Sequence, residues 1–271
     1  MIRSITLKIG LCAALWLGVL AERSFAEDSP ATLYFDHFIE IDLSNEVGFK
    51  AAIELQTGDV TPGRSTGVWG THKIITGPRA GQYVRWFGPL HWSALDQQID
   101  GAHSFSPEYE AFNRWPETVR PFLKNITTVI YDADLDSLYE GLGSSDMPLY
   151  FMVETRKVKP GMNQRKMAMD AKLAKAYEKA GVKANIINSR ILSGGDTQTY
   201  VTSFLFNSMA EFRKTQKADS FSKHYETAHG VGSWKRHLKE YNTILQEEPV
   251  ESELWRFLPE LSSKGESIQS N

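Results

Sequence analysis

An internal repeat restricts the fold of this chain more than any other feature of its sequence. The triplet Leu-Tyr-Phe at 33–35 recurs at 149–151, an offset of 116 residues, and Gln82 recurs as Gln198 at the same offset. Matches that share one offset indicate that a supersecondary unit occurs more than once along a chain. We therefore expect this chain to contain two copies of one unit.

The second half shows the order of the elements most clearly. Pro160-Gly161 separates a first strand from a long helix, Gly181 favours the end of that helix, and Gly194 lies in a hairpin turn. Hydrophobic periodicity supplies the remaining boundaries. It predicts strands at 149–158, 184–192, 197–206 and 253–257, and helices at 162–180, 209–217 and around 234–242.

The first half predicts the same order. Ser44 can cap a helix that ends near Gly58, and a turn at 76–81 separates two strands. The pattern predicts strands at 33–41, 67–75, 82–87 and 126–131, and helices at 44–58, 92–99 and 115–124. Because 132–148 contains closely set Gly and Ser residues, we expect it to be the linker.

Each half therefore has the order βαββαβ, which is the ferredoxin-like unit. Helices cover one face of such a sheet, and the other face is apolar and bare. Burying apolar surface is favourable by roughly 25 cal/mol per Å², so the two bare faces should pack against each other. We predict an α+β fold of two tandem ferredoxin-like repeats packed sheet to sheet, at 27–143 and 144–271, the second with a C-terminal tail.

The segment 154–161, Glu-Thr-Arg-Lys-Val-Lys-Pro-Gly, leads into a long helix and carries a family resemblance. Together with the element order, it resembles the dimeric α/β-barrel superfamily, which includes NIPSNAP-type proteins, antibiotic-biosynthesis monooxygenases and haem-degrading enzymes. The resemblance implies an intramolecular pseudo-dimeric α/β barrel, and either a monomer or a homodimer. Members of one fold differ in activity, so the resemblance does not select a reaction.

The first 26 residues have the features of a secretory signal peptide. Arg3 and Lys8 precede an apolar run of 12 residues at 9–20, which is too short for an ordinary membrane span. Ser24-Phe25-Ala26 fits a cleavage site, and Val19-Leu20-Ala21 is an alternative. An uncleaved anchor is the other reading. We expect a periplasmic or secreted protein without a stable membrane span after cleavage.

Cysteine content and charge exclude several classes of protein. The only cysteine, Cys12, lies in the signal segment, so the mature chain has no disulfide, thiolate nucleophile or Cys-ligated metal. The formal charge is -3 and no basic block occurs, which argues against a nucleic-acid partner.

Two histidines are candidates for catalytic bases. His37 shares a strand face with Phe35 and Ile39, and His72 shares one with Ile74. Each could serve as a general base inside the barrel. The alternative is that each is a core histidine that is satisfied by a hydrogen bond.

The densest aromatic stretch, 83–92, follows a strand that also carries aromatic and basic residues. If their faces meet, they form an aromatic wall with basic groups, which suits a planar aromatic or anionic organic ligand. The alternative is that the rings are packing between two sheets. The predicted ligand-binding residues are Trp69, Lys73, Tyr83, Arg85, Phe87, Trp92, Arg156 and Arg190.

His224 and His229 are candidate haem ligands by resemblance. Haem-degrading relatives carry the axial histidine four residues after a phenylalanine, whereas His224 follows Phe221 by three. Haem is therefore a hypothesis, and ordinary surface histidines are the alternative. Five residues on a helix separate side chains by about 140°, so we predict no metal site at this pair.

Two functions follow from these observations. The first is an exported protein of unassigned activity that binds a small aromatic or anionic organic ligand in a barrel pocket. The alternative is an oxygenase-like enzyme, either cofactor-free or haem-dependent, that acts on a small organic substrate. The sequence leaves open whether the protein is an enzyme.

Overall fold

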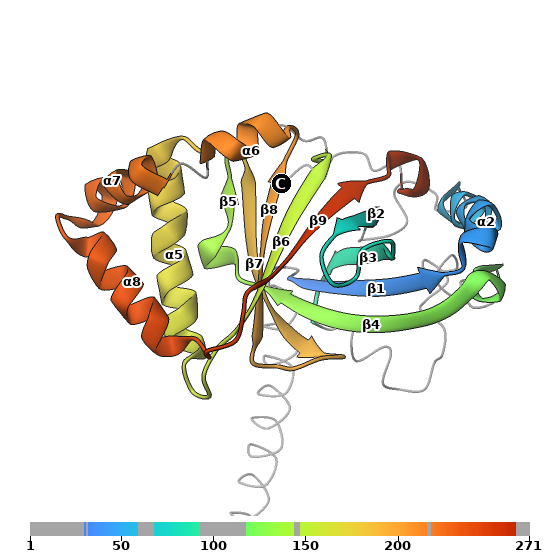
Figure 1. Cartoon of the computed structure of the whole chain (residues 1–271), viewed down its shortest axis with the longest axis horizontal. Helices are drawn as coiled ribbons and strands as arrows, with labels where there is room; N and C mark the ends of the chain where they lie inside the picture. Colours follow the sequence, from blue (N-terminus) through green and yellow to red (C-terminus); the bar gives the residue numbers. More distant parts are fainter. Residues whose placement is uncertain are drawn as a thin grey trace, which may run out of the picture.

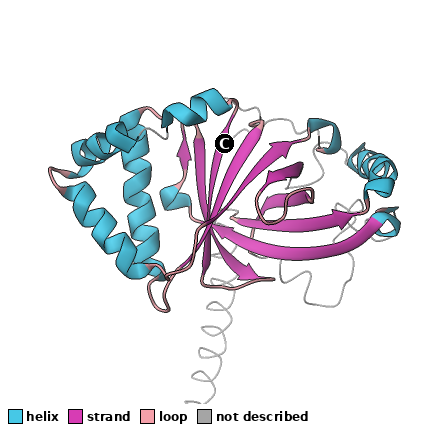
Figure 2. Ribbon diagram, in the orientation of Figure 1, coloured by secondary structure: helices cyan, strands magenta, loops and turns pink. Residues whose placement is uncertain are grey.

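The computed structural model describes residue 30 and residues 32–58, 68–92, 118–143, 147–215 and 218–263. In this part of the chain, strands form the centre and helices lie outside them (Figures 1 and 2). The strands are β1 (Leu33–Ile41), β2 (Val68–Thr76), β3 (Tyr83–Leu90), β4 (Leu123–Ala133), β5 (Tyr139–Glu140), β6 (Tyr150–Lys157), β7 (Asn185–Ser193), β8 (Thr199–Phe206) and β9 (Glu251–Phe257). The helices are α2 (Glu46–Gly58), α5 (Asn163–Ala180), α6 (Met209–Thr215), α7 (Ala218–His229) and α8 (Ser233–Ile244).

Eight of these strands close into an antiparallel barrel. Their order is β4-β1-β3-β2-β9-β6-β8-β7, and β7 pairs with β4 to complete the ring. The two halves meet at β2 and β9, where His72 lies opposite Phe257, and at β4 and β7, where Asp132 lies opposite Arg190. β5 pairs with β7 outside the ring. The α+β barrel predicted from the sequence is confirmed.

Alternation along each strand divides the side chains between the barrel interior and its outer face. The interior holds one apolar core to which all eight strands contribute, including Phe38, Ile74, Val84, Val129, Phe151, Ile191, Val201 and Trp255. Residues at the alternate strand positions point outward and pack against the helices. Ile39 and Tyr83 lie against Phe49 and Ile53 of α2, and Phe206 lies against Phe212 of α6.

The helices α5, α7 and α8 stand together on one side of the barrel, and α2 lies on the opposite side (Figure 1). α5 ends as the sequence predicts: Gly181 adopts a left-handed conformation with φ of 58°, and its N–H donates to the carbonyl oxygens of Tyr177 and Glu178. This termination lets the chain return to the sheet as β7.

Two predicted boundaries are wrong. The helix expected at 115–124 extends too far, because β4 already begins at Leu123 after a short 3-10 turn at Arg120–Phe122. The expected linker also contains β5, which pairs with β7, so backbone pairing with a distant strand overrides the local Gly and Ser content. The helix expected at 92–99 lies outside the described residues apart from Trp92, as does the predicted signal segment.

Candidate functional site

A cavity lies between the outer face of β6, β7 and β8 and the helices α5, α7 and α8. We call it the helix-side cavity. Its volume is about 410 Å³. Sheet residues in its wall include Glu154, Arg156, Asn188 and Thr202, and helix residues include Asp170, Tyr177, Trp234, His237 and Tyr241. Clefts of this size are typical small-molecule sites.

Stacked rings on α8 form one wall. The ring of His237 lies 5.4 Å from Trp234 at an interplanar angle of 9°, and 5.7 Å from Tyr241 at 17°. These residues are three and four positions apart, so a single helix face brings them together. Tyr177 of α5 and Phe221 of α7 add a second ring pair, with centroids 4.8 Å apart.

His237 is the titratable group best placed for proton transfer in this cavity. Its side chain is buried, with 6% of its surface exposed, and its Nδ1 lies 2.9 Å from the hydroxyl oxygen of Tyr225. Burial lowers the pKa of His237 to about 4, and the positive charge of Lys172 contributes in the same direction. The imidazole is therefore neutral at pH 7.

Two polar side chains of the sheet, Arg156 and Asn188, also line the cavity. Arg156 donates to Oε2 of Glu154 at 3.0 Å, and its guanidinium carbon lies 5.6 Å from the ring centre of Tyr241. Asn188 donates to Oγ of Ser137 at 3.2 Å and accepts from Thr202 at 2.7 Å. These bonds hold the Asn188 amide in one orientation.

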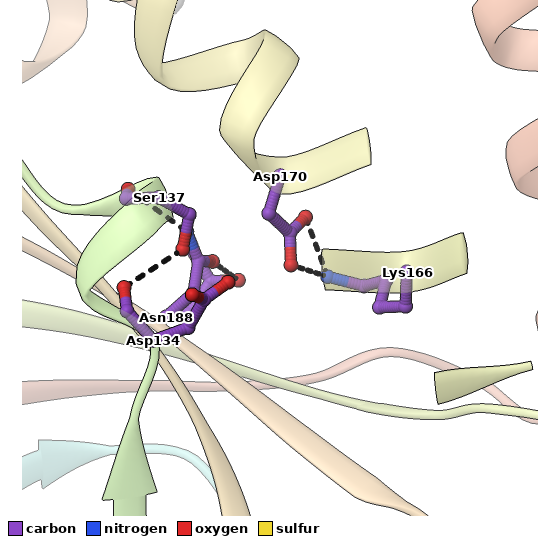
Figure 3. A network of polar contacts seen from close by, with 6 residues as sticks. Asp134, Ser137, Lys166, Asp170 and Asn188 are labelled. Atoms are coloured by element: carbon purple, nitrogen blue, oxygen red, sulfur yellow. Dashed lines mark hydrogen bonds and ion pairs between the residues drawn. The ribbon is translucent and has the colours of Figure 1, made fainter. Parts of the chain in front are cut away.

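A buried ion pair supports the cavity floor (Figure 3). Nζ of Lys166 lies 2.7 Å from Oδ1 of Asp170 one turn along α5, and the two residues are 1% and 2% exposed. Burial raises the pKa of Asp170, and Lys166 opposes that shift. The Lys166 ammonium also lies 5.6 Å from the ring of Tyr241. A buried charge must be paired, so Lys166 and Asp170 depend on each other.

Among the predicted ligand-binding residues, only Arg156 lines the helix-side cavity. The aromatic strands β2 and β3 do meet on one face, since Trp69 lies opposite Phe87 and Lys73 opposite Tyr83. However, Arg85 is fully buried there and donates to the carbonyl oxygen of Leu261 at 3.0 Å. Trp69, Tyr83, Arg85 and Phe87 are buried on this face, which fits the packing alternative, and their role in ligand binding stays a prediction.

The remaining predicted ligand-binding residues lie elsewhere. Lys73 donates to Glu46 at 2.9 Å, and Arg190 pairs with Asp132 at 3.0 Å. Trp92 is 43% exposed at the end of a described segment. None of these three shares a described cavity with Arg156.

The two predicted bases lie on opposite faces of the barrel wall. His37 points outward, where its ring stacks on Trp69 at 6.2 Å and its Nδ1 lies 2.8 Å from Oγ1 of Thr128. The prediction that His37 lies inside the barrel is therefore wrong. His72 does point inward, but it is fully buried 4.2 Å from the ring of Phe151, and burial lowers its pKa to about 3.

The predicted haem ligands do not fit an axial position in the helix-side cavity. Both lie on α7, but His224 lines a separate hollow with Lys183 and Lys214. Nε2 of His229 lies 2.8 Å from the carbonyl oxygen of Lys172, which occupies the nitrogen that would bind iron. Residues 32–58, 68–92, 118–143, 147–215 and 218–263 also contain no group of three or more His, Cys, Asp or Glu residues able to hold a metal.

Sequence reasoning missed most of this site. The spacing of Trp234, His237 and Tyr241 at positions i, i+3 and i+7 is a helical signal that could have placed them on one face. The pair Lys166 and Asp170 has the spacing of an ordinary exposed ion pair. Nothing in the sequence distinguishes it as buried.

Comparisons with known proteins identify a fold. No protein-family model and no curated protein matches the sequence. A proposed monooxygenase from Lactobacillus acidophilus aligns with a TM-score of 0.54 at 9% identity, covering 89% of this chain and all of that one. A proposed monooxygenase from Fusobacterium nucleatum aligns with a TM-score of 0.52 at 10% identity, covering 88% and 97% of the two chains.

An anthrone oxidase-like protein aligns with a TM-score of 0.50 at 11% identity, covering 85% of this chain and 92% of that one. At such identities the likeness concerns the fold. Within the described residues, no helix is long and apolar enough to cross a membrane. The chain therefore shares the fold of these three proteins, which here is an eight-stranded antiparallel barrel with helices outside it.

Proposed function

We propose that this protein is an oxygenase-like enzyme that oxidises a small planar aromatic compound with O₂ in the helix-side cavity. The observation that carries the proposal is the meeting of a stacked aromatic wall, a buried neutral His237 and the Arg156 guanidinium in one cavity of about 410 Å³. The monooxygenase-like description of proteins with the same fold supports this reading over simple ligand binding.

The aromatic wall binds the substrate. Trp234 and Tyr241 present faces on which a planar ring can stack or pack edge-on, which is the favourable geometry for aromatic pairs. Tyr177 and Phe221 close the cavity from α5 and α7. A site of this composition excludes much of the water around the bound ring, which strengthens the polar contacts of the substrate.

His237 accepts the proton that the substrate loses. In the tautomer whose Nδ1–H donates to Tyr225, Nε2 is free to accept a proton from the substrate. Its low pKa makes it a weak base, so the substrate must become more acidic on binding. Arg156 supplies this effect, because a guanidinium beside the developing anion lowers its free energy.

The resulting carbanion or enolate donates electrons to O₂. For a methylene group between two rings, CH₂ and O₂ become C=O and H₂O. The carbon loses four electrons and O₂ accepts four, so the substrate itself supplies the reducing equivalents. Because His224 and His229 do not fit haem here, no step depends on that group.

The test uses anthrone as the probe substrate. Full-length protein should accelerate the O₂-dependent formation of anthraquinone, followed by absorbance and by an oxygen electrode. His237→Asn and Arg156→Met should each lower kcat/KM by about 100-fold or more, the effect typical of losing a general base or an anion-stabilising group.

His224→Asn is the matched control, because His224 lies on α7 but lines a separate hollow. Its kcat/KM should equal that of the wild type. Saturable anthrone binding without turnover would contradict the enzyme and favour a ligand-binding protein. Equal rates for the wild type and His237→Asn would contradict the assigned base.

We also propose that the chain is a tandem repeat exported from the cytoplasm. The equal strand order of the halves, β4-β1-β3-β2 and β9-β6-β8-β7, supports the repeat. The signal-like composition of the first 26 residues supports export. Proteomic identification of the mature N-terminus would test the second proposal.

A further inference from the structure

A second cavity lies inside the barrel, on the other side of the sheet from the helix-side cavity. We call it the barrel cavity. Its volume is about 150 Å³, and its wall includes Tyr34, Asp36, Trp86, Phe151, Ser203 and Trp255. The two cavities share no lining residue, since alternate residues of β7 and β8 face opposite sides.

Asp36 is the one acidic group in this wall. Only 9% of its surface is exposed, and the charge that acts on its carboxyl group is that of Arg79. The nearby cation, Arg79, is already committed: its Nε and one terminal nitrogen lie 2.9 and 2.8 Å from the two carboxylate oxygens of Glu253. Buried carboxyl groups normally have partners of their own, so a buried Asp36 beside an arginine that is paired with Glu253 requires an explanation.

Aromatic rings surround this carboxyl group. Tyr34 and Trp86 are arranged edge to face with centroids 6.1 Å apart, and Phe151 and Trp255 contribute further rings to the wall. Ring faces attract organic cations, and a carboxylate supplies the countercharge. A cavity of about 150 Å³ accommodates a molecule as large as benzene.

We propose that the barrel cavity binds a small organic ammonium ion, which packs among the aromatic rings and pairs with the Asp36 carboxylate. The cation supplies a charge partner for Asp36, whose neighbour Arg79 is paired with Glu253. Burial raises the pKa of Asp36 to about 7, which agrees with a carboxyl group that is costly to ionise without such a partner.

The experiment uses choline and its neutral isostere 3,3-dimethylbutan-1-ol as probes of the full-length protein. The two have the same shape and differ in charge. Binding is measured by calorimetry and by the fluorescence of the tryptophans in the wall. Choline should bind the wild type at least about tenfold more tightly than the alcohol, and Asp36→Asn should remove this preference.

Two variants complete the design. Ser203→Leu fills the cavity without changing charge and should abolish binding of both probes. Glu40→Gln removes an acidic group from the same strand outside the cavity, where Glu40 binds Lys124, and should leave binding unchanged. Equal binding of choline and the alcohol, or choline binding that survives Asp36→Asn, overturns the proposal. No saturable binding of choline also overturns it.

Discussion

Replacing Asp36 by asparagine should change how the stability of the protein depends on pH. Burial raises the pKa of this carboxyl from 3.8 to about 7, and Arg79 lowers it by a smaller amount. The carboxyl of the unfolded chain ionises near its ordinary pKa, whereas the folded state resists ionisation up to about pH 7. The folded state is therefore penalised progressively as the pH rises from about 4 to about 7.

The size of the penalty follows from the shift. About three pKa units correspond to about 4 kcal/mol in the free energy of unfolding at pH 8, as an upper bound that solvent in the cavity would reduce. Asp36→Asn has nearly the same shape and no ionisation. The free energy of unfolding of the variant, relative to that of the wild type, should therefore rise by about 2 to 4 kcal/mol from about pH 4 to about pH 8.

Urea unfolding at the two pH values measures this difference directly. The neighbouring Tyr34 and Tyr131 stay protonated throughout, because burial raises their pKa values further. A difference between variant and wild type that does not change with pH would refute the reasoning.

Three further changes test other parts of the structure. Lys166→Met should destabilise the protein by about 3 to 5 kcal/mol by leaving Asp170 unpaired, and the double variant with Asp170→Leu should recover most of that loss in urea unfolding. Gly70→Ala would place a Cβ 2.2 Å from the indole of Trp86, and it should lower the free energy of unfolding by about 1 to 3 kcal/mol; unchanged stability would contradict this contact. If His237 is the base, kcat/KM should fall as the pH drops through about 4, because protonation removes the acceptor; a profile with its lower limb near pH 6.5 would contradict its burial.

The local elements were predictable because their signals are local. The strand at 33–41 matches β1 exactly in its bounds, and Gly181 ends α5 where the sequence places a helix stop. The βαββ order of the second half also followed from periodicity and turn residues. These features depend on neighbours within a few positions along the chain.

The site was less predictable because alternation defines two faces of a strand but not which face is inside. Closure of the ring through β4 and β7 decides this, and it places His37 outside and Asp36 inside. The dense aromatic segment at 83–92 predicts a pocket, whereas in the structure its strand residues are buried around Arg85. Aromatic content alone does not separate a cavity wall from a core.

The sequence by itself determined the α+β class and most bounds of the described elements, since these follow from the spacing of apolar and turn-forming residues. Only the tertiary structure decided that α8 carries Trp234, His237 and Tyr241 to the same cavity as Arg156 of β6. It also decided that Lys166 is buried beside Asp170 and that Asp36 is buried in the wall of the barrel cavity. Burial and charge pairing arise from packing between segments far apart in the chain, and no local pattern encodes them.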